Sequence, residues 1–184
     1  MVYLAAAVVF VGLLGLVNFV ITAALVRRMK VHTELFNQLA DRPGGGTPAA
    51  PALPARTPIG DFTTTTIEGA IVSSAGLVGE TLIGFFAPGC TACTERFPDF
   101  LGYAGAMAGG RQQVLAVVVG EGRERDLYVQ RLAPVARVVV EGMNGPVATA
   151  FQVEGFPVFC LVGPDRTVIA CDLTVSSLRA MASV

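Results

Sequence analysis

The stretch FFAPGCTACTERFP, Phe85–Pro98, decides the fold of this chain. It overlaps a short apolar run, Thr81–Ala87, that is typical of a β-strand buried on both faces. A Pro-Gly turn follows, and the next residues have the pattern of a helix that extends to about residue 108. Cys90 and Cys93 are therefore expected to lie one turn apart at the start of that helix.

This placement favours a redox-active cysteine pair. The first turn of a helix has free N–H groups and the positive end of the helix dipole, and both stabilise a thiolate. Cys93 lies one turn beyond Cys90, close enough to attack a mixed disulfide formed there. The alternatives are two structural thiols in the core or half of a zinc site. A zinc site needs further ligands, and residues 59–184 contain no histidine, so we expect no metal here.

The residues after this helix alternate between strand-like and helix-like patterns. Two β-rich runs near the C-terminus flank a Gly-Pro-Asp-Arg turn, which is typical of a hairpin. The order of elements predicts an α/β fold, a mixed sheet with helices on both faces. We expect strands at 113–120 and 136–141, a helix at 124–132, helical turns at 146–153, the hairpin at 156–173 and a closing helix at 175–184.

The N-terminal region predicts a single-pass membrane anchor. Residues 4–26 carry no charge, and as a helix they would reach about 35 Å, enough to cross a hydrocarbon core. The following segment, 27–40, begins with basic residues and suits a juxtamembrane helix. Residues 41–58 are rich in proline and glycine and predict a linker, which leaves a folded domain at 59–184.

The composition argues against a nucleic-acid partner. The chain has a formal net charge of −1 and contains 53% hydrophobic but only 15% charged residues. Proteins that bind nucleic acids usually concentrate Lys and Arg on one face, and no such cluster occurs in the expected domain.

Two segments carry a family resemblance. PIGDFTTTTIEGAIVSSAGLVGETLIGFFAPGCTACTERFP, Pro58–Pro98, resembles the opening of the TlpA/ResA-type membrane-anchored thioredoxins. GPVATAFQVEGFPVFCLVGPDRTVI, Gly145–Ile169, resembles their segment that carries a cis-proline before the hairpin, with Pro157 in that place. The resemblance covers Pro58–Asp172. The anchor and basic helix are also loosely similar to the methylamine-dehydrogenase maturation thioredoxins, the MauD group.

The resemblance implies a thioredoxin fold and a role for each site residue. Cys90 is implied as the nucleophile and Cys93 as the resolving thiol. A cis-Pro157 would pack beside their disulfide, and the backbone of Phe156 would pair with an extended substrate. The implied partners are a protein thiol or disulfide substrate and a second protein that restores the redox state. No cofactor is implied.

The sequence departs from the thioredoxin pattern around the motif. Gly84 stands where a buried acid is common, and Gly89 stands where Trp is common. Glu121, after the second strand, is a candidate substitute for the acid in proton transfer. The dipeptide Thr91-Ala92 matches neither the Gly-Pro of typical reductants nor the Pro-His of strong oxidants. The direction of electron flow therefore stays open.

We expect a membrane-tethered thiol–disulfide oxidoreductase that acts on a protein partner, with maturation of an extracytoplasmic protein as one role. The alternatives are a peroxiredoxin-like peroxidase and a non-catalytic, membrane-anchored binding or metal-delivery module. Cys160 and Cys171 are either ordinary buried thiols or, if the hairpin register places them opposite each other, a bridge or a second relay.

The side of the membrane is a separate question. Arg27, Arg28 and Lys30 follow the apolar run, and by the positive-inside rule they favour a cytoplasmic domain. The family resemblance and the linker favour the extracytoplasmic side, where disulfide chemistry has most of its substrates. We expect an extracytoplasmic domain.

Overall fold

The computed structural model of the chain describes residues 52–182. The expected transmembrane helix (4–26), the juxtamembrane helix (27–40) and the first part of the linker (41–51) lie outside the described residues. Within residues 52–182, no helix combines the length and the apolar character needed to cross a membrane.

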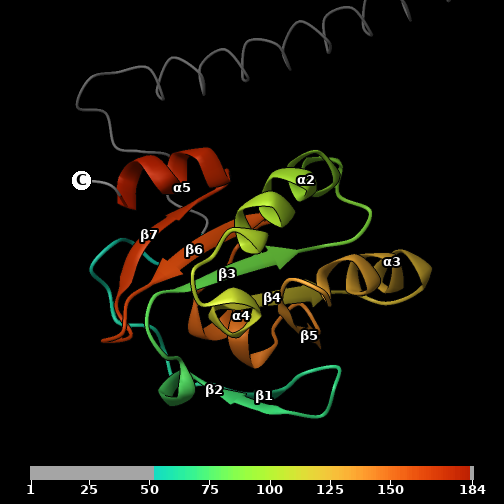
Figure 1. The fold of residues 1–184 in the computed structure, drawn as a ribbon. Helices are drawn as coiled ribbons and strands as arrows, with labels where there is room; N and C mark the ends of the chain where they lie inside the picture. The colour runs from blue at the N-terminus through green and yellow to red at the C-terminus, as the bar shows by residue number, and fades with distance from the viewer. Residues whose placement is uncertain (1–51, 183–184) are drawn as a thin grey trace, which may run out of the picture. The chain divides into compact units, whose positions relative to one another are not determined.

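A five-stranded mixed sheet forms the centre of the domain (Figure 1). Its strands are β3 (Thr81–Phe86), β4 (Val114–Val119), β5 (Arg137–Glu141), β6 (Val158–Val162) and β7 (Val168–Asp172). The spatial order is β5-β4-β3-β6-β7, and β3, β4 and β5 run parallel. β6 is antiparallel to both of its neighbours. The predicted α/β class and mixed sheet are confirmed.

Helices cover both faces of this sheet. Figure 1 shows α2 (Thr91–Gly105) and α5 (Val175–Ala182) on one side, with α4 (Pro146–Ala150) and the small β1–β2 hairpin on the other. The hairpin pairs β1 (Thr63–Thr65) with β2 (Ile71–Ser73), and α3 (Arg123–Leu132) connects β4 to β5. Short 3-10 turns at Ser74–Gly76 and Gly110–Gln113 complete the elements.

The core is divided by the sheet into two clusters of buried residues. Every residue of β3 and β4 is buried, as the continuous apolar runs predict for central strands covered on both faces. Successive side chains of a strand point to opposite faces. Ile83 and Phe85 accordingly join the cluster beneath α4, while Leu82 and Phe86 join the cluster beneath α2 and α5.

Helix α2 positions the cysteine motif and follows its predicted course, ending at Gly105 rather than near residue 108. Its buried side chains include Cys93, Phe97 and Phe100, which are spaced three and four residues apart and form the apolar stripe of an amphipathic helix. Pro98 lies inside α2 but is exposed, so it faces away from the core. A proline there removes one backbone hydrogen bond of the helix.

The packed domain begins earlier than the predicted boundary at Ile59. Ala52 and Leu53 are buried in the α4-side cluster, and the Leu53 N–H donates to the Phe151 carbonyl at 3.1 Å. Pro58 forms a β-bridge with Thr167. Residues 52–58 are therefore packed against the domain instead of belonging to a linker, because their backbone pairs with segments far away in the sequence.

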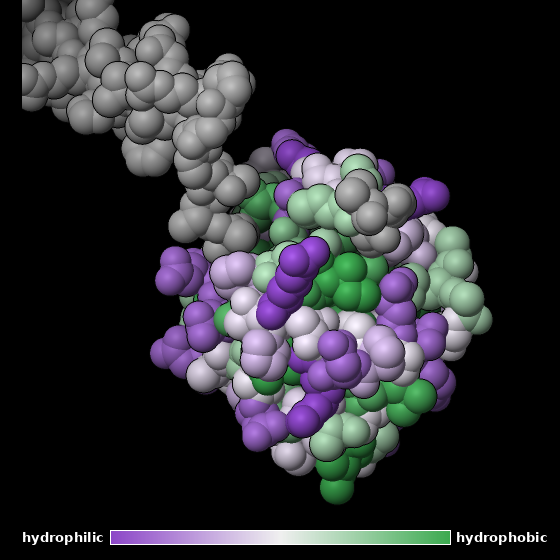
Figure 2. All heavy atoms as spheres, turned by 90° about the vertical axis from the view of Figure 1, so that its left-hand side faces the viewer, coloured by the Kyte–Doolittle hydropathy of each residue, from purple (hydrophilic) through white to green (hydrophobic). Residues whose placement is uncertain are grey.

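The described residues on the side of the β7 edge present a mixed surface. Figure 2 shows this side with small hydrophobic areas between hydrophilic side chains. Ile169 and Leu173 are the exposed hydrophobic residues of this strand and its end. Charged Asp165, Arg166 and Asp172 lie close to them in the sequence, at the two ends of β7, and such charges discourage pairing of an edge strand with another chain.

Candidate functional site

Cys90 is the N-cap residue of α2. It follows β3 through a turn in which Gly89 has a φ of +86°, a conformation that glycine adopts at little cost. The Cys90 N–H donates to the Ala87 carbonyl at 3.2 Å, and the Cys90 side chain is half-buried. The thiol thus lies at the N-terminus of a 15-residue helix, as predicted.

Cys93 lies one turn further along α2 and is fully buried. Burial, with a smaller contribution from the neighbouring Cys90 thiol, raises the pKa of the Cys93 thiol to about 12, although a hydrogen bond with the Ala87 backbone opposes the shift. Both cysteines are free thiols in this structure. The pair therefore combines an accessible sulfur with a shielded one that holds its proton firmly.

Phe156 and Pro157 lie beside Cys90. The Phe156–Pro157 peptide bond is cis, as the family resemblance implied. The Cys90 Sγ donates to the Phe156 carbonyl oxygen at 3.6 Å. The contact arises because β3 and β6 are antiparallel neighbours, with Phe85 paired to Val158, so the residues after β3 meet the residues before β6.

The place of the buried acid is filled by an aromatic ring. Gly84 faces α2, and a Cβ atom added there would overlap the ring of Phe100. Glu121 is exposed in the loop after β4. The carboxylate next to the motif is instead that of Glu124, because a Cβ at Gly89 would lie 3.2 Å from its Oε2. The proton-transfer role of Glu121 stays a prediction.

A groove of about 520 Å³ runs beside the motif. We call it the α2–α3 groove. Its walls are formed by Thr91, Thr94 and Phe97 of α2 and by Leu127, Tyr128 and Arg131 of α3, with Gly89 and Glu124 at one end. Nothing in the sequence pattern alone assigns these residues to a site. The i, i+4 spacing of Leu127 and Arg131 was the available signal, but it does not reveal which helix the α3 side chains face.

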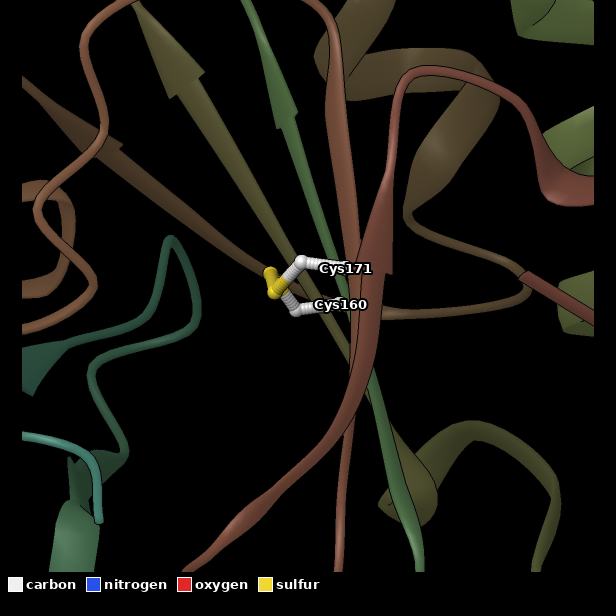
Figure 3. Close-up of a disulfide and its surroundings, with 2 residues drawn as sticks. All are labelled: Cys160 and Cys171. Carbon is white, nitrogen blue, oxygen red and sulfur yellow. A yellow bond between two sulfur atoms is a disulfide. The ribbon is translucent and has the colours of Figure 1, made fainter. Parts of the chain in front are cut away.

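Cys160 and Cys171 form a disulfide between β6 and β7. They are directly opposite in the antiparallel register, with Cα atoms 4.1 Å apart. Figure 3 shows both side chains pointing to the same side of the sheet. Cys160 belongs to the α4-side cluster, whereas Cys93 belongs to the α2-side cluster. The sheet therefore separates this disulfide from the cysteine pair, which disfavours a direct relay between them.

The described residues offer little for a metal ion. Within 52–182, no group of three or more His, Cys, Asp and Glu side chains is placed to hold one. What the site offers chemically is an accessible thiol at a helix N-terminus, a second thiol behind it, and a backbone carbonyl beside the first. These are the parts of a dithiol–disulfide exchange site.

Strand order, the Cys-x-x-Cys motif at the start of the helix after β3, and a cis-proline before β6 together define a thioredoxin fold. Solved structures agree. The thioredoxin domain of a thiol-disulfide oxidoreductase from Bacteroides vulgatus is 20% identical with a TM-score of 0.58, and the match covers 71% of this chain and 96% of that one. No protein-family model and no curated protein matches the chain.

Two further structures share the fold. A thioredoxin-family thiol:disulfide interchange protein from Chlorobium tepidum is 19% identical with a TM-score of 0.54, over 72% of this chain and 97% of that one. A secreted disulfide oxidoreductase from Mycobacterium tuberculosis is 17% identical with a TM-score of 0.52, over 66% and 94%. At these identities the likeness establishes the fold.

Proposed function

We propose that this protein is a thiol–disulfide oxidoreductase that exchanges its Cys90–Cys93 pair with a protein partner. The observation that carries the proposal is the arrangement of an accessible Cys90 between the N-terminus of α2 and the Phe156 carbonyl, with Cys93 buried one turn behind. The solved structures that share the fold include thiol-disulfide oxidoreductases, which supports the same chemistry.

In the reducing direction, the Cys90 thiolate attacks one sulfur of the partner disulfide. A Cys90–partner disulfide forms, and the other partner sulfur leaves as a thiolate and takes up a proton. Cys93 then gives up its proton and attacks the Cys90 sulfur, which forms the Cys90–Cys93 disulfide and releases the partner as a dithiol. Two electrons and two protons pass to the partner. A second protein returns the pair to its starting state.

The same steps run backwards in the oxidising direction. In the reducing direction, the Cys93 thiolate is the species that resolves the mixed disulfide. Because the pKa of Cys93 is high, this thiolate is scarce near neutral pH. Resolution is therefore expected to need a base. Among the described residues, Glu124 lies next to Gly89 and the flanking loop carries Glu121, so these two carboxylates are the candidates.

The membrane tether and the TlpA/ResA-like role belong to the proposal as well. The apolar run at 4–26 supports an anchor, and the Cys160–Cys171 disulfide supports an oxidising, extracytoplasmic compartment for the domain. The likeness to a secreted oxidoreductase agrees with that side. We propose maturation of an extracytoplasmic protein as the role. A protease that digests the domain in intact cells supports this placement, and protection of the domain contradicts it.

The experiment that tests the chemistry is trapping in cells with the Cys93→Ser chain. Without the resolving thiol, the Cys90–partner disulfide persists and is isolated by nonreducing electrophoresis. The matched control is Cys90→Ser, which keeps Cys93 but cannot form that bond. Recovery of the same adducts with both variants, or with neither, contradicts the proposal. A peroxidase is distinguished by hydrogen peroxide consumption, which the proposed exchange does not require.

A further inference from the structure

The α2–α3 groove lies beside the reactive cysteine, although Cys90 itself is not part of its walls. Gly89 and Thr91, the residues on either side of Cys90, both line it. The residues that flank the cysteine of a polypeptide joined to Cys90 are therefore within reach of this groove. Its volume of about 520 Å³ lies within the range of sites that take a ligand group, roughly 300–1,000 Å³.

The floor of the groove is aromatic and held in place. The rings of Tyr128 and Phe97 are in contact, with centroids 4.4 Å apart, and Tyr128 also packs on Phe86. The Tyr128 hydroxyl lies 3.3 Å from Thr94 Oγ1, and that oxygen donates to the Cys90 carbonyl at 3.3 Å. Two aromatic rings and a chain of hydrogen bonds thus fix the floor relative to the cysteine.

The wall that α3 contributes leaves apolar surface in water. Leu127 is 53% exposed although its neighbour along the chain, Tyr128, is packed against Phe97 and Phe86. An exposed leucine at the rim of an aromatic groove adds apolar area that a ligand side chain can cover. Each methylene group that is buried in this way strengthens such an association.

The groove also has a positive charge available for an anionic partner. The Arg131 guanidinium lies over the Phe97 ring, 4.8 Å from its centroid. The ion pairs among the residues that the structure describes involve other arginines. The Arg131 guanidinium is therefore available to pair with a carboxylate of a ligand. Arg131 lies seven residues, or about two turns, beyond Glu124, which marks the Cys90 end of the groove.

We propose that the α2–α3 groove is a substrate subsite for a partner segment with a large apolar side chain close to its cysteine and an acidic side chain further away. The apolar side chain lies on the Phe97–Tyr128 floor against Leu127, and the acidic one pairs with Arg131. This subsite rests on the proposed exchange at Cys90 and specifies the substrate class for it. A basic side chain in the distant position fits less well, because it brings a second cation to Arg131. A small polar side chain close to the cysteine also fits less well, because it leaves the aromatic floor uncovered.

The test measures how fast synthetic peptides form a disulfide with the full chain carrying Cys93→Ser. Each peptide cysteine carries a 5-thio-2-nitrobenzoate group. The Cys90 thiolate attacks the peptide sulfur, a Cys90–peptide disulfide forms, and the coloured thiolate leaves. Three peptides differ only near the cysteine. One has Phe and a more distant Glu, a second has Ser for the Phe, and a third has Lys for the Glu.

We expect the Phe–Glu peptide to react fastest. Leu127→Ser should lower the Phe-to-Ser rate ratio about five- to tenfold, the effect of losing several buried carbon atoms. Arg131→Glu should reverse the preference for Glu over Lys. The matched control is Ile71→Ser, which also removes an exposed aliphatic side chain, 78% exposed, but from the β1–β2 hairpin, and it should leave both ratios unchanged.

The outcomes separate the two proposals. Equal rates for all three peptides, or ratios that Leu127→Ser and Arg131→Glu leave unchanged, overturn the subsite while the exchange chemistry stands. An absence of peptide adducts at Cys90 for every peptide overturns the exchange chemistry itself. Circular dichroism of each variant shows whether the fold is intact, and Leu127→Ala replaces Leu127→Ser if it is not.

Discussion

The ring of Phe100 occupies the space beside Gly84 that any larger residue at position 84 would need. Gly84 lies in the fully buried strand β3, and Phe100 points from α2 onto the sheet and stacks on Phe159 with ring centroids 5.4 Å apart. The strand position where the thioredoxin pattern carries an acid is therefore closed by packing. Cys93 and Phe100 belong to the same cluster of buried apolar residues, so the Cys93 thiol lies among apolar side chains.

Gly84→Ala should destabilise the domain by about 1–3 kcal/mol, because the added methyl group overlaps the fully buried ring of Phe100. Phe100→Leu removes part of the ring, so the double variant should lose less stability than the sum of the two single variants. Urea unfolding of all four proteins measures this coupling. Additive losses would show that Phe100 is not what fills the space. The matched control is Gly102→Ala in α2, since nothing lies within 4 Å of its added Cβ.

The Cys93 thiol should react slowly with iodoacetamide near neutral pH. Its pKa of about 12 implies that the thiolate fraction grows about tenfold per pH unit throughout pH 7–10. In the Cys90→Ser chain, burial remains as the main cause of the high pKa, so the alkylation rate should rise over this range without a plateau. Mass spectrometry of quenched samples measures the rate. A plateau below pH 9 would contradict the shielded environment.

Local patterns and the family resemblance were enough to predict the mixed sheet, the placement of the cysteine pair and the cis-proline. These features depend on short stretches such as Phe85–Pro98, where the turn, the helix start and the cysteines are adjacent in sequence. The sequence leaves the pairing of Cys160 with Cys171 open, because a shift of one residue in the hairpin register would separate them. Only the three-dimensional register settles such a choice.

Other features depend on contacts between distant segments. Leu53 is buried, and its backbone N–H forms a hydrogen bond with the Phe151 carbonyl. A composition typical of linkers was therefore misleading at residues 52–58. The α2–α3 groove exists because Tyr128 packs on Phe97 across two helices. Neither the helical pattern of α2 nor that of α3 indicates which side chains meet, so the residues of the groove could not be identified from the sequence.

Loss of the Cys160–Cys171 disulfide should lower stability without abolishing exchange at Cys90. The two cysteines are 11 residues apart, and constraining the unfolded chain over such a length contributes about 2–3 kcal/mol. The Cys160→Ala, Cys171→Ala double variant should therefore unfold at lower urea concentration. Its rate of mixed-disulfide formation should be unchanged, since the sheet separates the two cysteine pairs. A parallel loss of that rate would indicate that the pairs are coupled.

Glu141 connects the end of β5 to the start of α4. Its carboxylate accepts the N–H groups of Val147 and Ala148 at 3.2 and 2.8 Å, so it caps a helix that has no capping side chain of its own. Burial nevertheless raises the pKa of Glu141 above its ordinary value of 4.5, and the two hydrogen bonds only partly oppose this shift. Ionisation is thus less favourable in the folded protein than in the unfolded chain.

The sign of the resulting pH dependence follows from that shift. Between pH 4.5 and the higher folded pKa, the unfolded chain loses the Glu141 proton first, so this residue lowers the stability of the protein as the pH rises. Glu141→Gln keeps the shape but carries no titrating proton. Its free energy of unfolding should therefore increase relative to wild type between pH 4 and pH 7, as measured by urea unfolding. Glu141→Ala loses the cap at both pH values, by about 0.5–2 kcal/mol. If the free energy of unfolding of Glu141→Gln instead falls relative to wild type as the pH rises, the hydrogen bonds outweigh burial.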